Sequence, residues 1–381
     1  MRNAVRIVLT AAIIGSAAAP PGLARAELNA ANSPASTTRP FKATTVARFD
    51  TPWAIAFLPD GRMLVTEKGG QLFLVTPAGA KTEVSGVPRV QAGGQNGLLD
   101  IAASPGFARD GLVYFSYVEP SFGGGTLALA RARLKEVDGK AGLDDLAVIW
   151  RASPKGGGGQ PGGIIAFAPD GRHLFLSSGD RMEPETAQNT DTNRGKILRL
   201  NLDGTAPADN PMAAKGGVQA EIWSLGHRNP YGLAFAPDGG LWENEMGPRG
   251  GDELNLIRRG ANYGWPIVSN GDNYSGVPIP RHRTRPEFEA PVIYWTPIIA
   301  PAGLAFYSGK LFPQWRGSAF IGALGGEALV RIAFDSKDGA RQADRWEMGA
   351  RIRDVAVDRD GAIWLIEDAS DGRLLRLTPA K

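Results

Sequence analysis

The sequence contains no cysteine and only three histidines among its 381 residues. The absence of cysteine excludes disulfide bonds and every reaction that depends on a thiolate. Three histidines leave little scope for metal sites built mainly from imidazole. His173 lies in a turn and His282 in a basic loop, so we expect both at the surface, whereas His227 stands in a different motif described below.

Long apolar runs are also missing after the N-terminus. The first 26 residues have the order of a secretory signal, with Arg2 and Arg6 before an apolar stretch and a small-x-small sequence at the end. The apolar stretch is shorter than the roughly 20 residues that a membrane span needs, and Pro20-Pro21 end it. The sequence therefore predicts a cleaved signal peptide at residues 1–26, no membrane span, and a periplasmic or secreted protein.

The chain lacks a charge excess once this leader is set aside. Lysine and arginine number 42 against 39 aspartates and glutamates, and residues 1–26 hold three of the arginines and no acidic residue. The remainder is therefore balanced, with 39 side chains of each sign. The basic balance of the full chain thus gives no indication of a nucleic-acid partner.

Glycine and proline are abundant, with 50 and 28 residues, which suits many short strands joined by tight turns. After a polar, flexible lead-in at residues 27–40, one phrase returns six times: an apolar pair, a short strand, a turn often written Pro-Asp-Gly, and another strand. The phrases begin at Trp53, Gly97, Gly162, Tyr231, Ala302 and Arg353. They start 44 to 71 residues apart, enough for a four-stranded blade of roughly 40–50 residues plus loops on one face. An irregular β-sandwich does not predict such a repeat, so residues 41–381 are expected to form an all-β, six-bladed β-propeller.

Two basic motifs stand just before such phrases, where loops over a central channel arise. Arg228 and Asn229, in "SLGHRNPYGLAF", suit an anionic, carbonyl-rich ligand, and structural capping of the loop explains them equally well. Arg351 and Arg353 are two residues apart and therefore lie on one face of a strand. Their charges repel each other unless an anion lies between them or the face is solvated. Gln95 occupies a similar loop before the second phrase.

The stretch "NEMGPRGGDELNLI" (244–257) is rich in oxygen ligands. Ca²⁺ prefers carboxylate and carbonyl oxygens, and Gly-Pro turns present carbonyls in irregular directions. Asp252 and Glu253 are candidate ligands, as are the carbonyl groups of Gly247 and Pro248. The spacing is not that of an EF-hand.

A second conspicuous stretch, "KGGGGQPGGIIAF" (155–167), is not a phosphate-binding loop. No Gly-Lys-Ser or Gly-Lys-Thr follows it, and a strand follows where a helix should. Its glycines permit a close approach of backbone to a ligand.

Taken together, the motifs resemble the PQQ-dependent glucose/sorbosone dehydrogenase family, in particular its soluble aldose sugar dehydrogenases. The resemblance covers about residues 45–379 and rests on phrases in family order: "GQNGLLDIA", "GKILRLNLDG", "EIWSLGHRNPYG", "GPRGGDELN", "NYGWP", "AGLAFY", "FPQW", "FIGAL" and "RIRDV". The family fold is a six-bladed propeller, as the repeats independently predict. The resemblance implies a sugar substrate, an external electron acceptor and pyrroloquinoline quinone (PQQ) over the central channel.

The resemblance also implies roles for individual residues. PQQ contacts map onto Gln95, Arg228, Asn229, Arg351 and Arg353. One Ca²⁺ would be held at the quinone partly by the carbonyls of Gly247 and Pro248, and a second would lie near Glu253 and Tyr263. In the family a histidine accepts the proton of the sugar C1 hydroxyl while hydride passes to the quinone, and the arginine that matches Arg228 stabilises the developing charge.

The sequence departs from the family at the catalytic histidine. In the motif Asn-His-x-Gly-Gly-Arg, the histidine position is Gln160 and the arginine position is Ile164. The family's PQQ-binding lysine maps to Gly325. An amide has no usable basicity near neutral pH, so Gln160 can orient a hydroxyl but cannot accept its proton. Asp180 matches the acidic residue that supports the family histidine.

Three interpretations follow from these departures. Asp180 acts as the base, directly or through water; the site serves a different substrate; or the propeller binds PQQ, a sugar or an envelope partner without oxidation. A Ca²⁺-dependent lactone hydrolase would share the propeller but needs an acidic ring at the channel, which the "HRNP" and "RIRDV" surroundings do not supply.

Overall fold

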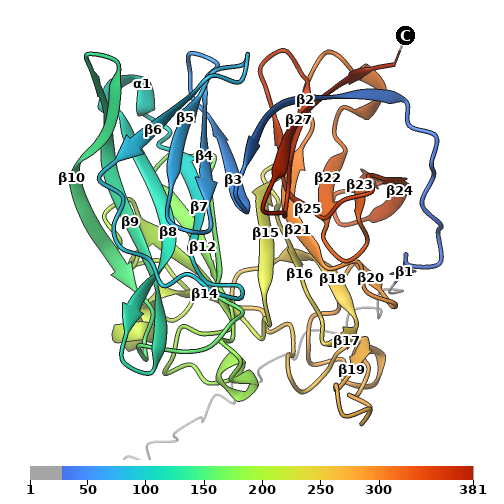
Figure 1. The fold of residues 1–381 in the computed structure, drawn as a ribbon. Coiled ribbons are helices and arrows are strands. Elements are labelled where there is room, and N and C mark those ends of the chain that lie inside the picture. Colours follow the sequence, from blue (N-terminus) through green and yellow to red (C-terminus); the bar gives the residue numbers. More distant parts are fainter. Residues whose placement is uncertain (1–27, 381) are drawn as a thin grey trace, which may run out of the picture.

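Six short strands line a central channel, and each is the innermost strand of one blade. They are β3 (Pro52–Phe57), β7 (Leu98–Ala103), β11 (Gly162–Phe167), β15 (Pro230–Phe235), β21 (Pro301–Phe306) and β25 (Ile352–Val357). Neighbouring inner strands contact each other in this order, and β25 returns to β3. The structure is a computed structural model that describes residues 28–380, and it confirms the predicted six-bladed propeller (Figure 1). The predicted signal peptide lies outside the described residues.

Each blade adds antiparallel strands outward from its inner strand. In chain order these are β4 (Met63–Glu67), β5 (Leu72–Val75), β6 (Lys81–Ser85), β8 (Leu112–Ser121), β9 (Gly124–Val137), β10 (Lys140–Arg151), β12 (His173–Ser178), β13 (Lys196–Asn201), β14 (Ile222–Leu225), β16 (Leu241–Glu245), β18 (Asp252–Ile257), β20 (Ile293–Trp295), β22 (Ala319–Ala323), β23 (Ala328–Phe334), β24 (Ala340–Glu347), β26 (Ile363–Glu367) and β27 (Gly372–Pro379). The first two blades share one eight-stranded sheet because β6 and β10 pair at their outer edges.

Short elements occupy the connections between the strands. They are the helix α1 (Phe107–Asp110), the hairpin β17 (Arg249–Gly250) with β19 (Gly271–Asp272), and five 3₁₀ turns: η1 (Pro184–Ala187), η2 (Ala213–Lys215), η3 (Gly217–Glu221), η4 (His282–Thr284) and η5 (Pro313–Trp315). None of the helices in the described part of the chain has the length and apolar character that a membrane crossing needs.

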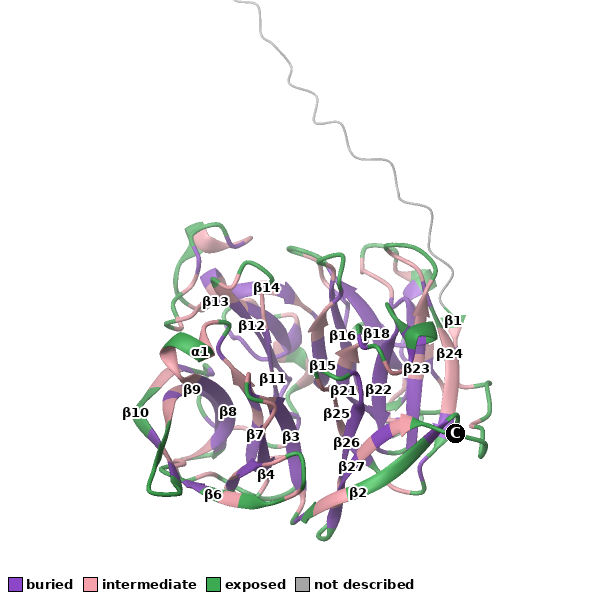
Figure 2. Ribbon diagram, turned by 90° about the horizontal axis from the view of Figure 1, so that it is seen from above, coloured by how far each residue is buried: buried purple, intermediate pink, exposed green. Residues whose placement is uncertain are grey.

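Burial follows position within the blade. Second strands are sandwiched between neighbouring blades, and β4, β16, β22 and β26 are buried at every residue. Their buried residues include glutamates and an asparagine as well as apolar residues, as in the sequence LWENE of β16. The outermost strands, such as β6 and β10, keep exposed residues, and Figure 2 shows them at the rim around a buried centre.

The Pro-Asp-Gly phrases form the predicted turns between first and second strands. At Asp60-Gly61 the N–H of Gly61 donates to the carbonyl of Leu58, and the Asp60 side chain accepts the N–H of Arg62. Gly61 has a φ of +88°, a backbone conformation that favours glycine. Gly171 repeats the arrangement in the third blade, with a φ of +66°.

Two acidic side chains tie inner strands of adjacent blades together. Asp100 on β7 accepts the N–H of Ile165 on β11 at 2.7 Å, and Asp354 on β25 accepts the N–H of Ile55 on β3 at 2.8 Å. Both line a cavity of about 160 Å³ within the channel. Burial, reinforced by the charge of Asp354, raises the pKa of Asp100 to about 8, and burial raises the pKa of Asp354 to about 7.

The last blade joins the two ends of the chain. Strand β2 (Phe41–Phe49) pairs antiparallel with β27, so the sixth blade takes its outer strand from the N-terminal part and its inner three from the C-terminal part (Figure 1). The lead-in also contacts the propeller. β1 (Leu28–Asn29) pairs in parallel with β20, and Ser36 bridges to Trp346. Backbone hydrogen bonds therefore hold a segment that its polar composition predicts to be flexible.

Candidate active site at the channel mouth

Residues that precede different inner strands meet at one end of the channel. Gln160, just before β11, is only 6% exposed, and its backbone N–H donates to Oε1 of Gln95, just before β7, at 2.7 Å. With its amide oriented to satisfy both neighbours, Gln160 donates to Oδ1 of Asp180 at 2.5 Å and accepts from Nη2 of Arg228 at 2.8 Å. The position of the family histidine therefore bridges a carboxylate and a guanidinium.

Asp180 is completely buried at the centre of this group. Oδ1 also accepts the N–H of Met182 at 2.9 Å, and Oδ2 accepts Nε1–H of Trp265 at 2.8 Å. Burial raises the pKa of Asp180 to about 6, even though the hydrogen bonds from Met182 and Trp265 and the charge of Arg228 act to lower it. Asp180 is thus a carboxylate that titrates slightly below neutral pH and has no solvent-exposed surface.

Arg228 and Asn229 are fixed through their backbone as well as their side chains. Both backbone N–H groups donate to Oε2 of Glu245, at 2.5 and 3.2 Å. Nη1 of Arg228 donates to the carbonyls of Met246 and Gly247 at 2.9 and 2.8 Å, and its guanidinium lies over the Trp265 ring. These hydrogen bonds show that Arg228 and Asn229 do cap the loop structurally. The Arg228 side chain nevertheless remains at the mouth of the channel, in contact with Gln160.

The paired arginines have an anion of the protein's own between them. Nη2 of Arg351 and of Arg353 lie 2.9 and 3.0 Å from Oδ2 of Asp368. Burial raises the pKa of this carboxyl, but the charges of Arg353 and Arg351 and their hydrogen bonds outweigh it, so the net shift is downward. Their proximity thus needs no bound anion. Arg353 is not solvated, because it is 8% exposed and lies over the rings of Trp53 and Tyr231.

The calcium candidates lie next to Arg228. Asp252 accepts the backbone N–H groups of Gly247, Ile299 and Ala300 with its two carboxylate oxygens, so it shapes the loop. The Gly247 carbonyl faces Arg228, and Pro248 is buried beside it.

A cavity of about 10 Å³, with room for one ion or water, is lined by Glu245, Gly247, Glu253 and Tyr263 among others. The Tyr263 hydroxyl is used up, because it donates to the Leu256 carbonyl and accepts the N–H of Arg258. Glu245 and Glu253 are therefore the side chains best placed to supply charge to this cavity.

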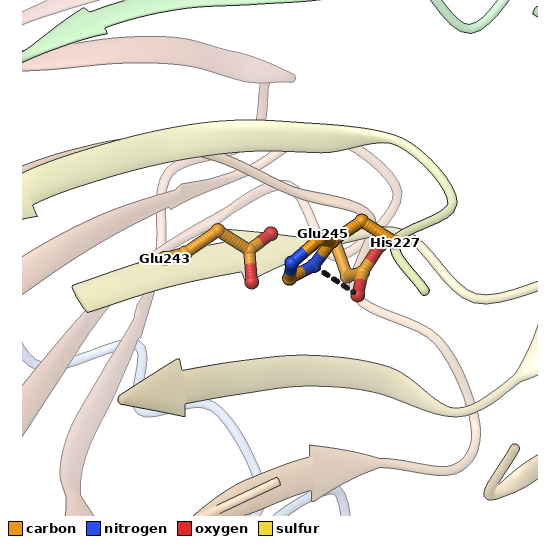
Figure 3. A group of neighbouring side chains, drawn as sticks. All are labelled: His227, Glu243 and Glu245. Atoms are coloured by element: carbon orange, nitrogen blue, oxygen red, sulfur yellow. Dashed lines mark ion pairs between the residues drawn. The ribbon is translucent and has the colours of Figure 1, made fainter. Parts of the chain in front are cut away.

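His227 forms a buried acidic cluster that the sequence did not predict. It lies with Glu243 and Glu245 so that one ligand atom of each is within 4.8 Å of the others, and none is more than 4% exposed (Figure 3). The sequence does contain an indication of this cluster: Glu243 and Glu245 are two residues apart on a strand, so their side chains lie on the same face. The expectation of a surface position for His282 is wrong: it is 2% exposed, because the turn η4, which begins at His282, packs with the Nε2 atom of this residue against the carbonyl of Tyr263.

The glycine-rich stretch is held in place by two buried arginines. Arg181 donates to the carbonyls of Gly125 and Gly157, and Arg194 donates to those of Pro154, Lys155 and Gly156. A Cβ atom on Gly157 would come within 2.9 Å of the Arg181 side chain. The glycines therefore allow the loop to close against these arginines, next to Gln160.

Gly325 lies apart from this network, in the exposed turn between β22 and β23. A Cβ atom there would meet Ala300 at 3.3 Å, and its φ is not in the left-handed region. The position of the family's lysine thus carries no side chain, although one would fit with a small shift.

Comparison with known proteins agrees with this geometry. The family model described as Glucose / Sorbosone dehydrogenase matches residues 49–376. The aldose sugar dehydrogenase of Escherichia coli strain K12 is 41% identical over 344 residues, which is 87% of this chain and 91% of that protein.

Solved structures give the same result. The crystal structure of the soluble aldose sugar dehydrogenase from Escherichia coli in its apo form superposes with a TM-score of 0.83 at 39% identity, covering 89% of this chain and all of that one. The PQQ-bound form of aldose sugar dehydrogenase from Streptomyces coelicolor gives a TM-score of 0.71 at 31% identity and covers 90% and 99% of the two chains.

Proposed function

Because the chain belongs to the glucose/sorbosone dehydrogenase family, we propose that it is a PQQ- and Ca²⁺-dependent dehydrogenase that oxidises an aldose or a related hydroxy or aldehyde compound. One observation carries the proposal: Gln95, Gln160, Asp180, Arg228 and Asn229 form a continuous network at one end of the channel. The family resemblance assigns these five positions, together with Arg351 and Arg353, to cofactor and substrate. We also propose export to the periplasm or beyond, from the predicted leader.

The residues at the channel mouth fit a flat tricarboxylate such as PQQ. Arg228 and Arg353 supply positive charge, and the buried Nε of Arg353 has no hydrogen-bond partner among the described residues. Gln95 and Asn229 supply amides beside them. When bound, PQQ would supply the quinone that accepts hydride from the sugar. The neutral amides and arginines form the kind of donor set that binds carboxylates.

The neighbouring acidic residues fit bound calcium. Glu245, Gly247 and Glu253 line a cavity of one-ion size with Tyr263, and Pro248 follows Gly247 in the chain. Carboxylate and carbonyl oxygens are the ligands that Ca²⁺ prefers. We propose the carbonyls of Gly247 and Pro248 for an ion at the cofactor, and a second ion near Glu253, with Tyr263 in the wall of its cavity rather than as a hydroxyl ligand.

Proton removal from the substrate falls to Asp180 in this proposal. The Gln160 amide orients a hydroxyl but has no basicity, whereas Asp180 titrates near pH 6 and is in direct contact with Gln160. Because Asp180 is fully buried, a water molecule that passes Gln160 must carry the proton. Arg228 places positive charge where negative charge develops on the substrate oxygen. An external acceptor then takes the electrons.

A second function is favoured by two specific positions. With an amide at Gln160 and no side chain at Gly325, the propeller would bind PQQ, a sugar or an envelope partner without oxidising it. The two candidates differ only in turnover, because both keep the same binding residues.

Reconstitution of the purified protein tests both candidates. The protein is mixed with PQQ and Ca²⁺, binding is followed by the PQQ absorbance, and dye-linked oxidation is measured on a panel of aldoses. Binding with turnover is the expected result. Binding without turnover would favour the binding propeller, and no PQQ binding at all would overturn the dehydrogenase.

A further inference from the structure

The cluster of His227, Glu243 and Glu245 lies directly next to the backbone of Arg228 and Asn229, whose N–H groups donate to Glu245. Glu243 and Glu245 come from the fully buried strand β16, and His227 comes from the loop between β14 and β15. Nδ1 of His227 lies 3.4 Å from Oε1 of Glu245. In Figure 3 the carboxylate of Glu243 faces the imidazole from the other side.

In each of the three side chains, one polar atom is held by a hydrogen bond and the other polar atom faces the rest of the cluster. His227 shares a 2.9 Å hydrogen bond between Nε2 and Oγ of Ser224, while its buried Nδ1 has no hydrogen-bond partner in the described structure. Oε2 of Glu243 accepts Nδ2–H of Asn255 at 3.0 Å, while its buried Oε1 has none there.

Glu245 follows the same pattern. Its Oε2 accepts the two backbone N–H groups of Arg228 and Asn229, and its Oε1 faces His227. Anchoring of the distal atom by a hydrogen bond is the arrangement that fixes the tautomer and direction of metal ligands in proteins.

Charge gives an independent reason for a cation here. In the described part of the chain, neither Glu243 nor Glu245 forms an ion pair with a lysine or arginine, because the Arg228 guanidinium is directed at Gln160 and at backbone carbonyls. Two carboxylates buried on one strand face repel each other, and burial of unpaired charge is costly. A divalent ion between them would neutralise both.

We propose that His227 Nδ1, Glu243 Oε1 and Glu245 Oε1 bind a divalent transition-metal ion such as Zn²⁺ or Mn²⁺. One imidazole with two carboxylates suits these ions better than Ca²⁺, which takes oxygen ligands. The 3.4 Å separation of His227 and Glu245 matches the about 3.4 Å between ligands of a tetrahedral zinc site.

The ion has a positioning role for the proposed active site. Glu245 holds the backbone of Arg228 and Asn229 with one oxygen and would hold the metal with the other. Metal binding would therefore restrain the loop that carries these residues. Metal binding at this site does not require PQQ, so it can be tested independently of the dehydrogenase proposal.

Metal content and cobalt spectroscopy test this site. The full chain is stripped with a chelator, refolded with Co²⁺ or Zn²⁺, dialysed, and analysed for bound metal; Co²⁺ reports ligation through its visible absorption. We expect one equivalent per chain in the wild type and none in Glu243→Gln, which preserves shape but removes the charge. Ser224→Ala, which removes only the anchor of His227, should weaken Co²⁺ binding about 10–100-fold.

Glu67→Gln serves as the matched control, because Glu67 is likewise a buried glutamate at the end of the second strand of a blade but is not in the cluster. Its metal content should equal that of the wild type. No uptake by the wild type, retention in Glu243→Gln, or an equal loss in Glu67→Gln would each overturn the proposal, the last because the loss would then not be specific to the cluster.

Discussion

At the scale of single residues, the backbone of Gln160 matters as much as its side chain. Its φ of +53° lies in the left-handed region, where histidine is several-fold enriched among non-glycine residues. A histidine is therefore accommodated there, and its ring would lie between Asp180 and Arg228. The site thus retains the carboxylate partner that a catalytic histidine needs.

Gln160→His should raise turnover of the PQQ-loaded protein by about 10²–10⁴-fold, since a general base contributes a factor of that size. The measurement is kcat on the best aldose of the panel. Gln160→Asn is the control, because asparagine tolerates the same backbone and remains a neutral amide. An equal rise of kcat in both variants would contradict the role of position 160 as the site of the general base.

Asp180→Asn should lower the residual turnover of the wild type and remove its dependence on pH. Burial raises the pKa of Asp180 to about 6, so a base at this position gains activity as the pH rises through about 6. The pH profile of kcat between about 4 and 8 checks this. If the profile and rate were unchanged in Asp180→Asn, Asp180 would have no part in proton removal.

Gly325→Lys should tighten PQQ binding by about 10–100-fold, the range that a charged hydrogen bond of about 1.5–3 kcal/mol gives. The turn is exposed and can take a side chain after a small shift of Ala300. Titration of the apo-protein with PQQ measures the change. Gly325→Gln separates charge from bulk and should leave the affinity nearly as it is.

At the scale of elements, the inner strands carry a pH dependence of stability. Asp100 and Asp354 have folded-state pKa values of about 8 and 7, above the about 4 of an unfolded carboxyl. Between those values the folded state holds more protons than the unfolded state, so their contribution to stability falls as the pH rises from about 4 to about 8.

Asp354→Asn should therefore become more stable relative to the wild type as the pH is raised over this window. Thermal unfolding at several pH values gives the difference in Tm at each. Asp138→Asn, a change in an exposed turn, should give a difference that does not vary with pH. A constant difference for Asp354→Asn would show that its carboxyl is not protonated in the folded state.

The first two strands of each blade could be predicted from the sequence, but the rest could not. The repeated phrase begins at Trp53, Tyr231 and Arg353, within one residue of the starts of β3, β15 and β25. The outer strands have mixed burial and no shared phrase, so nothing local marks them. Pairing of β2 with β27 joins segments more than 300 residues apart, which no pattern within a repeat encodes.

Some parts of the candidate site could likewise be predicted from the sequence, and others could not. Gln95, Gln160 and Arg228 each precede an inner strand, so the repeat brings them to one end of the channel. Asp368 directly follows β26, so the hairpin of β25 and β26 brings it between Arg351 and Arg353. Trp265, which donates to Asp180, is brought in by long-range folding, and its neighbours in the sequence give no sign of this contact.

At the scale of the whole molecule, closure of the ring depends on β2. Removal of residues 1–49 should lower the Tm and broaden unfolding, because β27 would become an unpaired edge and the sixth blade would lose a strand. Removal of residues 1–40 takes away only β1 and the lead-in, and should leave a cooperative transition close to that of the full chain. Calorimetry of both truncated proteins measures the Tm and the width of the unfolding transition. Equal values for the two proteins would contradict a closing role for β2.

The sixth blade also sets an order of events during biosynthesis. β2 emerges from the ribosome near the beginning of translation, and its partner β27 is among the last segments to be made. Until then the early blades form an open arc, whose first inner strand lacks its neighbour β25. Contacts of such long sequence separation form slowly. A chain of this design therefore has a built-in delay in which it stays incompletely folded, and a product truncated before β27 lacks the strand that pairs with β2.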